Sequence, residues 1–230
     1  MAKSAVARVS QTAAEPLSVH AQRLDALARI AVKVGLNVAK GQEVVMTAPV
    51  EGADLARLIA THAYRAGASL VTTLYDDEAL SLLRYQHAPD ASFDAAAGWL
   101  YDGMAKAYAN GAARLAIRGG NPSLLAGQSP DKVSRANRAM SKAYQPALEK
   151  ITGFDINWTI VPYASPAWAK AVFPNASEKT ATAKLWDALF SSTRADTPDP
   201  IAAWKSHNKE LARRTKLLHA RRFASALRKR

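Results

Sequence analysis

The densest group of acidic side chains in this sequence is the run Asp76, Asp77 and Glu78. Carboxylate oxygens are the preferred ligands of hard cations, so a cation site is one interpretation of this run. The competing interpretation is structural, because Asp77 is a suitable helix cap and Glu78 complements the positive end of a helix dipole. We favour the structural interpretation because it accounts for two of the three residues.

The five histidines are scattered along the chain, and none stands in His-x-His or His-x-x-x-His spacing: His20, His62, His87, His207 and His219. His207 and Glu210 are three residues apart in a predicted helix and could share one face, as metal ligands do. An exposed polar helix face explains the same pair, and we favour that interpretation. The chain contains no cysteine, which excludes disulfides, a thiol nucleophile and Cys-ligated metal sites.

The segment Ala126–Pro130, Ala-Gly-Gln-Ser-Pro, contains half of a nucleophile elbow but lacks its closing glycine. A helix start explains this segment better, with Ser129 as the cap and Pro130 in the first turn. Neither Gly-x-Gly-x-x-Gly nor Gly-x-x-x-x-Gly-Lys-Ser/Thr occurs, so dinucleotide and P-loop phosphate binding have no support. We therefore predict no catalytic and no metal-ligating residue in this chain, and its substrate-binding residues remain unknown.

A strand–helix–strand unit forms the central part of the predicted fold, and that fold positions these side chains. Gly41–Thr47 predicts a buried strand, Glu51–Ala66 has the apolar spacing of a helix, and Ser69–Tyr75 predicts the next strand. Tight connections of this kind predict parallel strands joined by a right-handed crossover. Ligands of such sheets bind at the carboxyl ends of the strands, so Ala48–Glu51 and Asp76–Glu78 lie on the expected functional edge.

The remaining elements alternate in the same way. The predicted helices are Ser18–Val34 with Gly35 as its stop, a short helix from Asp77 to Pro89, Ser92–Asn110, Ser129–Ile151 with Pro146 kinking or ending it, Pro166–Val172, Glu178–Phe190 and a long final helix from Asp199. The predicted strands are Arg114–Arg118 and Ile156–Val161. This alternation predicts an α/β fold: a largely parallel sheet flanked by helices on both faces, with a long C-terminal helix.

Four aromatic residues gather in and after the last predicted strand: Trp158, Tyr163, Trp168 and Phe173. One interpretation is a small aromatic core around a proline-shaped turn. The other is the wall of a ligand cleft at the carboxyl end of a strand. Composition does not separate the two interpretations, and both stay open here.

The net charge of +12 is unevenly distributed, because residues 205–230 contain ten Lys and Arg against one acid. Leu217, Ala220, Ala224 and Leu227 form an apolar stripe among these basic residues, a pattern typical of a helix docked on a partner surface. We predict non-specific affinity for polyanions but no specific nucleic-acid binding, since no RNA-binding motif accompanies the charge.

The composition divides the chain into three parts. Residues 1–16 are predicted to be a mobile leader, because they are polar and Ala-rich without the apolar run of a secretory signal. Residues 17–195 are predicted to form the α/β domain, and residues 196–230 a Pro-containing linker followed by the basic helix. No run of 18 apolar residues occurs, so we expect no membrane span and a cytoplasmic location.

Several stretches of the sequence together resemble one known family. They are Val34–Val45, Ala48–Glu51, Tyr64–Val71, Trp99–Met104, Asn157–Pro174, Thr193–Asp196, Asp199–Trp204 and His207-Asn208. In unbroken order from about Leu24 to Phe223, they are similar to the N-terminal half of the thermophilic metallo-aminopeptidases, the group of aminopeptidase T, aminopeptidase S and aminopeptidase II. No single piece is a generic motif, so the resemblance is specific.

The resemblance implies the N-terminal domain of an enzyme that releases N-terminal residues from peptides with two divalent metals of the zinc or cobalt type, and it implies a homodimer. In the family a second domain supplies the glutamates, histidines and aspartate that hold these metals, and the assisting tyrosine. A strand opening with a Gly-Pro-Gly-Thr-Asp-like sequence is expected soon after Phe223, whereas this sequence reads Ala224–Arg230 instead. No family metal ligand therefore maps onto this chain, and we expect the chain alone to be inactive.

A second hypothesis from another class is a non-catalytic α/β binding or interaction module. The coding sequence beyond Arg230 distinguishes the two hypotheses. Ligand-bearing sequence of the family in any frame supports the peptidase, and a stop codon with nothing similar downstream supports the interaction module.

Overall fold

A computed structural model describes the backbone of residues 17–227 and the side chains of residues 17–220. The predicted mobile leader, residues 1–16, lies outside the described residues. Four strands form one sheet: β1 (Glu43–Pro49), β2 (Leu70–Asp76), β3 (Ala113–Arg118) and β4 (Trp158–Pro162). Their order is β2-β1-β3-β4, and every neighbouring pair is parallel. The predicted parallel α/β sheet is thus confirmed.

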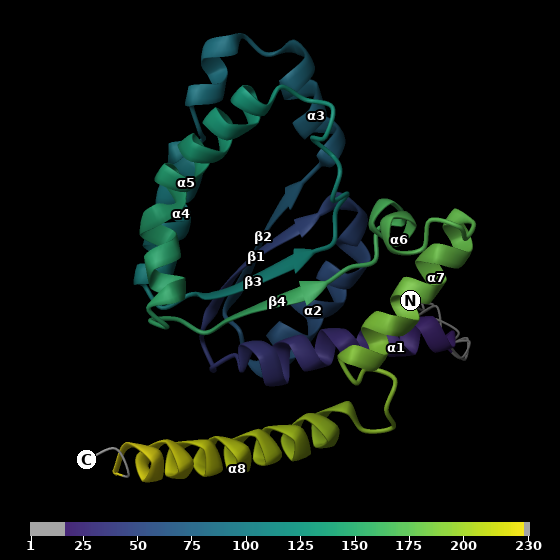
Figure 1. The fold of residues 1–230 in the computed structure, drawn as a ribbon, viewed down its shortest axis with the longest axis vertical. Helices are drawn as coiled ribbons and strands as arrows, with labels where there is room; N and C mark the ends of the chain where they lie inside the picture. Colours follow the sequence, from purple (N-terminus) through teal and green to yellow (C-terminus); the bar gives the residue numbers. More distant parts are fainter. Residues whose placement is uncertain (1–16, 228–230) are drawn as a thin grey trace, which may run out of the picture.

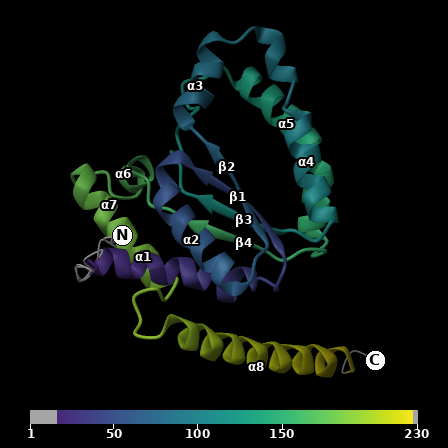
Figure 2. The ribbon, with the colours of Figure 1, turned by 180° about the vertical axis from the view of Figure 1, so that it is seen from behind.

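Helices cover both faces of this sheet (Figures 1 and 2). On one face lie α1 (Val19–Ile30), α2 (Ala53–Ala66) and α7 (Glu178–Ser192), and on the other lie α4 (Gly98–Ala109) and α5 (Pro130–Thr152). This division follows from right-handed crossovers, because β2 and β3 lie on opposite sides of β1. The order in which strands are added therefore reverses between β1 and β3, the two central strands, and this is the switch point of the sheet.

The two faces have separate apolar cores, since successive residues of a strand point to opposite faces. Val44, Met46, Leu115 and Ile117 are fully buried against the α1, α2 and α7 side. Val45 lies on the other face, where it joins a smaller core formed mainly by α4 and α5. This second core covers only part of the sheet face that α4 and α5 pack against.

Serine and aspartate side chains begin several helices, and the caps predicted at Ser18 and Asp77 are confirmed. The Oγ of Ser18 accepts from the Ala21 amide (3.2 Å) at the start of α1, and Asp77 Oδ1 accepts from the Ala79 amide (2.7 Å) at α3 (Glu78–His87). Ser165 and Ser177 cap α6 (Pro166–Val172) and α7 in the same way. These caps satisfy amide groups that have no partner inside the helix.

Gly35 was predicted to stop the first helix, and this prediction is wrong. The chain continues through a π-helical segment, η1 (Ala31–Leu36), and ends at Asn37, which adopts the left-handed conformation (φ 50°). A Cβ on Gly35 would lie 2.6 Å from Thr159 Oγ1. Gly35 therefore allows η1 to pack closely against β4, and it does not serve as a helix cap.

The predicted helix Ser92–Asn110 is interrupted. Its first part is the 3₁₀ segment η3 (Asp90–Asp94), and α4 begins only at Gly98. Arg84 holds the interrupted backbone, since its Nη2 donates to the carbonyl oxygens of Ser92 (2.7 Å) and Ala95 (3.0 Å). These carbonyls are bound by a side chain and not by a continuous helix.

Pro146 does not end its helix, because α5 runs through it for 23 residues. Proline removes one helical hydrogen bond and crowds the carbonyl four residues earlier. Pro146 and Lys142 are both exposed, so water can reach that carbonyl, while Ala147 and Ile151 bury the opposite side of the helix. Packing on the buried side holds the helix together across the proline.

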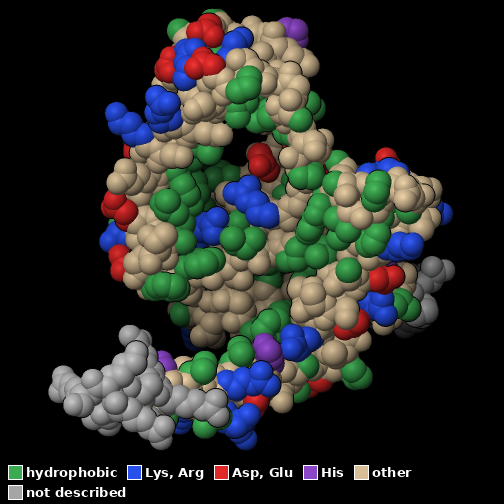
Figure 3. Space-filling model, viewed as in Figure 1, with side chains coloured by type: hydrophobic (Ala, Val, Ile, Leu, Met, Phe, Trp, Pro, Cys, Tyr) green, Lys and Arg blue, Asp and Glu red, His purple; other side chains and the backbone are tan. Residues whose placement is uncertain are grey.

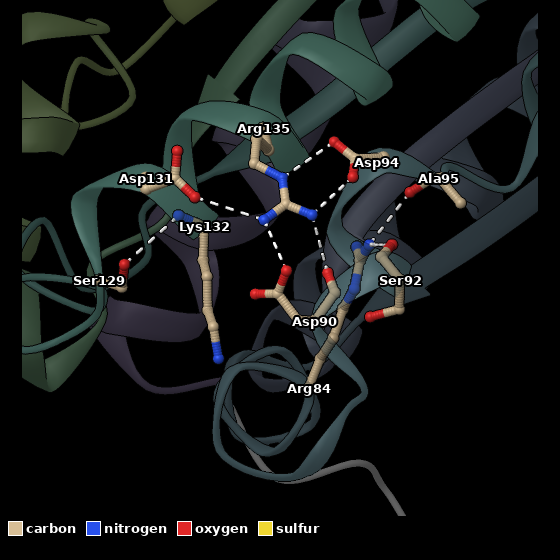
Figure 4. A network of polar contacts seen from close by, with 9 residues as sticks. All are labelled: Arg84, Asp90, Ser92, Asp94, Ala95, Ser129, Asp131, Lys132 and Arg135. Atoms are coloured by element: carbon tan, nitrogen blue, oxygen red, sulfur yellow. Dashed lines mark hydrogen bonds and ion pairs between the residues drawn. The ribbon is translucent and has the colours of Figure 1, made fainter.

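A lobe formed by α3 and η3 lies beyond the carboxyl edge of the sheet and is joined to α5 by Arg135 (Figures 1 and 4). Arg135 donates to Asp94 Oδ1 (2.9 Å), Asp90 Oδ2 (2.8 Å) and the Asp90 carbonyl (3.0 Å), and it also pairs with Asp131 (3.3 Å). Hydrogen bonds to Asp94, and then to Asp90, raise the pKa of Arg135, so its charge is permanent. The lobe is thus attached to α5 by charge-assisted bonds.

Within the side chains that the structure describes, the final helix, α8 (Pro200–Leu227), contacts the rest of the chain near its start. Trp204 Nε1 donates to the Thr193 carbonyl (2.8 Å), and the Arg194 guanidinium lies 5.0 Å from the centre of the indole ring. Every side chain from residue 211 to residue 220 is exposed, so Leu217 and Ala220 of the predicted stripe are uncovered. Ala224 and Leu227 lie outside the described side chains. Among the described residues, no helix is long and apolar enough to cross a membrane.

Candidate functional site at the carboxyl end of the sheet

A cavity of about 300 Å³ lies between the sheet and the helix pair α4–α5. Its sheet side presents Thr47 of β1, Asp76 of β2, and Arg114 and Arg118 of β3. Figure 3 shows the hollow, with basic side chains inside it and apolar side chains around it. Sheets of this class bind ligands where neighbouring strands send their connections to opposite faces, and β1 and β3 are such a pair.

The strand register places the polar residues of the cavity on one face. Thr47 pairs with Ala116, which stands midway between Arg114 and Arg118 on β3. Neighbours in register share a face, and residues two and four apart on one strand do as well. The opposite face of β3 carries Leu115 and Ile117 in the larger core. The sheet is therefore apolar on one side and partly polar on the side of the cavity.

The charges in the cavity are incompletely paired. Arg118 Nη1 lies 3.7 Å from Asp76 Oδ2, a long contact between two exposed side chains. Arg114 is partly buried, and its guanidinium has no hydrogen bond or ion pair with any described residue. The Thr47 hydroxyl oxygen is buried and likewise has no hydrogen-bond partner within the described structure.

Aromatic and thioether side chains complete the cavity. The rings of Tyr101 and Tyr144 meet edge to face with centroids 5.6 Å apart, and Met104 and Met140 lie beside them. Burial raises the pKa of Tyr101, so its hydroxyl keeps its proton at neutral pH and can donate a hydrogen bond. The cavity thus combines cationic and neutral donors with an apolar wall.

The three predicted acidic residues lie at this edge but turn to different partners. Asp77 caps α3, which confirms the structural interpretation of that residue. Glu78 Oε1 accepts from the Asn121 amide (2.6 Å), so it ties α3 to the turn after β3 and does more than complement a helix dipole. Asp76 faces Arg118. Within the described part of the chain, no group of three or more His, Asp or Glu side chains could hold a metal ion.

The other metal and nucleophile candidates also have separate partners. His207 packs edge to face on Trp204 (5.6 Å between ring centres), while Glu210 accepts from Arg213 and Arg214 (2.8 Å each). His62 is buried and contacts Asp25 (2.8 Å), joining α2 to α1. Ser129 caps α5 through the Lys132 amide, so the helix-start interpretation of Ala126–Pro130 is confirmed.

The ion pairs of Glu210 predict that the helical structure of α8 around this residue is sensitive to acid. Hydrogen bonds from Arg213, and then Arg214, lower the pKa of Glu210 from 4.5 to about 2. The stabilisation from a depressed pKa is present above 4.5 and is lost as the pH falls through the folded value. Backbone NMR shifts of residues 207–214 are expected to lose helical character as the pH falls from 4.5 towards 2. A Glu210→Gln variant should lack this step, and an identical titration in both proteins would contradict the prediction.

The four aromatic residues in and after the last strand divide between the two faces of the sheet. Trp158 packs with the smaller core and lies 6.3 Å from Phe154, whereas Tyr163 meets Trp186 on the other face at 5.2 Å. Trp168 and Phe173 pack against the larger core. The aromatic-core interpretation fits this arrangement, because none of the four residues lines the cavity.

Sequence reasoning missed Arg114, Thr47 and Arg135. One signal was available: Arg114 and Arg118 alternate with Leu115 and Ile117, which is the pattern of a strand with one polar face. Two of the partners of Arg135, Asp90 and Asp94, are more than 40 residues away, and helix periodicity carries no signal for them.

Comparisons with known proteins agree with the fold. A profile of the thermophilic metalloprotease (M29) family matches residues 20–229. Aminopeptidase T of Thermus thermophilus is 53% identical over 202 residues, which are 88% of this chain and 50% of that protein. Aminopeptidase AmpS of Bacillus subtilis is 36% identical over 204 residues, covering 89% of this chain and 50% of the relative.

A solved structure, wild-type AmpT from Thermus thermophilus, superposes with a TM-score of 0.82 at 51% identity. The match covers 87% of this chain and 49% of that chain. The chain thus spans about half the length of the relatives that it matches, and it corresponds to their N-terminal half. The protein therefore belongs to the thermophilic metalloprotease family.

Proposed function

We propose that this chain is the N-terminal α/β half of a dinuclear metal-dependent aminopeptidase, which releases N-terminal residues from peptides. The observation that supports this proposal is the 53% identity to an aminopeptidase T over 202 residues. Identity of this level across a whole α/β unit argues for a shared activity of the complete proteins, and not merely for a shared scaffold. A cytoplasmic location stays a prediction from the sequence, and a homodimer stays a prediction from the resemblance.

The residues that the structure describes do not fit a pair of divalent metals. Two-metal hydrolases need several ligands converging on ions about 3.5–4 Å apart. Asp76, Asp77 and Glu78 face three different partners, and Glu210 is bound by two arginines. We therefore propose that the metal ligands belong to the other half of the enzyme, and that the 230-residue chain alone does not hydrolyse peptides.

The contribution of this half is structural in our proposal. Residues 17–195 form the domain, and α8 leads towards the second half. Leu211, Leu217 and Leu218 are 47%, 49% and 65% exposed, which suits a helix whose apolar side chains are covered by further protein. The chain as described supplies no such cover for residues 211–220.

An activity assay tests this proposal. The purified chain is incubated with leucine p-nitroanilide and either Co²⁺ or Zn²⁺, and bound metal is measured in the same sample. Aminopeptidase T of Thermus thermophilus serves as the positive control. We expect no release of nitroaniline and no stoichiometric metal in the 230-residue chain. Turnover accompanied by bound metal would overturn the proposal, and Asp76→Asn and Glu210→Gln variants would then identify the ligands.

A further inference from the structure

The cavity between the sheet and α4–α5 has the composition of a small-molecule site, with a few converging polar groups and mostly apolar walls. We propose that it binds a small monocarboxylate with an apolar or aromatic body, about the size of one amino acid with a large side chain. The proposal concerns residues of this chain alone. It requires neither metal nor peptide hydrolysis and stands independently of the proposed function.

Arg114 supplies the first argument for an anion. Arg114 is partly buried and lines the cavity, and its guanidinium has no hydrogen bond or ion pair to any described residue. The charge-assisted hydrogen bonds of this guanidinium are therefore available to an anion in the cavity. The planar fork of a guanidinium matches both oxygens of a carboxylate. A ligand carboxylate would complete this pairing.

Arg118 and Thr47 add further donors to the same cavity. Arg118 has only its long contact with Asp76. Thr47 is in register with Ala116, so it stands between the two arginine positions, each about 7 Å along the strand from Ala116. Its buried hydroxyl has no partner in the described structure and can donate to a carboxylate oxygen. Two arginines and Asp76 give the sheet side a net charge of +1, which one negative charge neutralises.

The apolar walls of the cavity determine which chemical group can be attached to the carboxylate of the ligand. Leu74, Leu100, Met104 and Met140 present apolar surface, and Tyr101 and Tyr144 add an aromatic pair. Methionine side chains adapt to ligands of different shape. A phosphate has more oxygens than a carboxylate and would place some of them against the leucine and methionine side chains, which have no donors, and this is unfavourable. The lining therefore favours a carboxylate with an apolar body.

Calorimetric titration of the purified chain, at fixed low ionic strength and without added metal, tests the proposal. The probes are N-acetyl-L-phenylalanine, L-phenylalanine and L-phenylalaninamide, which lacks the carboxylate. We expect both carboxylates to bind and the amide to bind at least tenfold more weakly. Tighter binding of phenylalanine identifies a free amino acid as the ligand type, with its ammonium near Asp76. Tighter binding of the acetylated compound identifies a blocked or peptide carboxylate.

Matched variants locate the binding. Arg114→Gln is expected to weaken the binding of N-acetyl-L-phenylalanine at least tenfold. Arg138→Gln, the same change at an exposed position of α5, should leave the affinity unchanged. Thr47→Val should weaken binding several-fold yet raise the stability of the ligand-free protein, because it removes an unpaired buried hydroxyl. A purely structural threonine would not combine these two effects.

Three comparisons of affinity would overturn the proposal. They are equal affinity for the amide and the carboxylates, equal affinity for inorganic phosphate, or unchanged binding in Arg114→Gln. The absence of any heat of binding up to about 10 mM ligand would do the same, because the weakest useful small-molecule sites lie near that affinity. The comparison of carboxylate with amide uses the unmodified chain, so it does not depend on the folding of a variant.

Discussion

Gly119→Ala is expected to lower the free energy of unfolding by about 3 kcal/mol, as overpacking against fixed backbone does. A Cβ at Gly119 would overlap with the carbonyl oxygen of Tyr163. That oxygen cannot move away easily, because the Tyr163 amide donates to the Arg118 carbonyl (2.7 Å) at the end of the β3–β4 ladder. The substitution must therefore separate the ends of two paired strands.

Urea denaturation with linear extrapolation measures this loss. Gly103→Ala is the matched control, since Gly103 lies inside α4 with open space around the position of a Cβ. Alanine is the better helix former, so this control should gain up to about 1 kcal/mol. Equal stabilities of the two variants would show that the end of β4 is not fixed against β3.

Phe93→Ala is expected to unfold the α3–η3 lobe, with a loss of about 3 kcal/mol in the stability of that lobe. Phe93 is fully buried, yet it belongs to neither core of the sheet. Arg84 and Lys132 lie over its ring at 5.4 and 5.1 Å, and Tyr85 stacks nearby at 5.1 Å. The lobe thus depends on one aromatic anchor and on the Arg135 bonds shown in Figure 4.

Hydrogen exchange shows which amides lose protection in the Phe93→Ala variant. Amides of residues 78–97 should lose protection, while β1 and β3 keep theirs, because the two sheet cores are untouched. Leu80→Ala is the control, since Leu80 of α3 is 65% exposed and should change stability by less than about 0.5 kcal/mol. Loss of protection throughout the sheet would show that the lobe and the sheet unfold as one unit.

Local chemistry made much of this fold predictable. The caps at Ser18, Asp77 and Ser129 and the β1–α2–β2 unit depend on residues close together in the sequence, and the structure has them where the pattern indicates. Errors arose where distant contacts decide the outcome. Pro146 stays helical because α5 packs against α4. Gly35 does not end the first helix, because it allows close packing against Thr159.

The candidate site was predictable only in its location. Parallel strands place Asp76 at the carboxyl edge, and the structure agrees. The partners of Asp76 and Glu78, namely Arg118 and the Asn121 amide, lie more than 40 residues along the chain. The importance of Thr47 depends on its register with Ala116, which strand propensity does not define.

The strand order also bears on the kinetics of folding. Pairing β1 with β2 joins Glu43 to Leu70 across one helix, whereas pairing β1 with β3 joins Val44 to Ala113 across two strand connections. Closing the longer loop costs more chain entropy, and contacts distant in sequence slow the search for the native state. We therefore expect the β1–α2–β2 unit to form early and the central β1–β3 pairing, which sets Thr47 in register with Ala116, to be completed late.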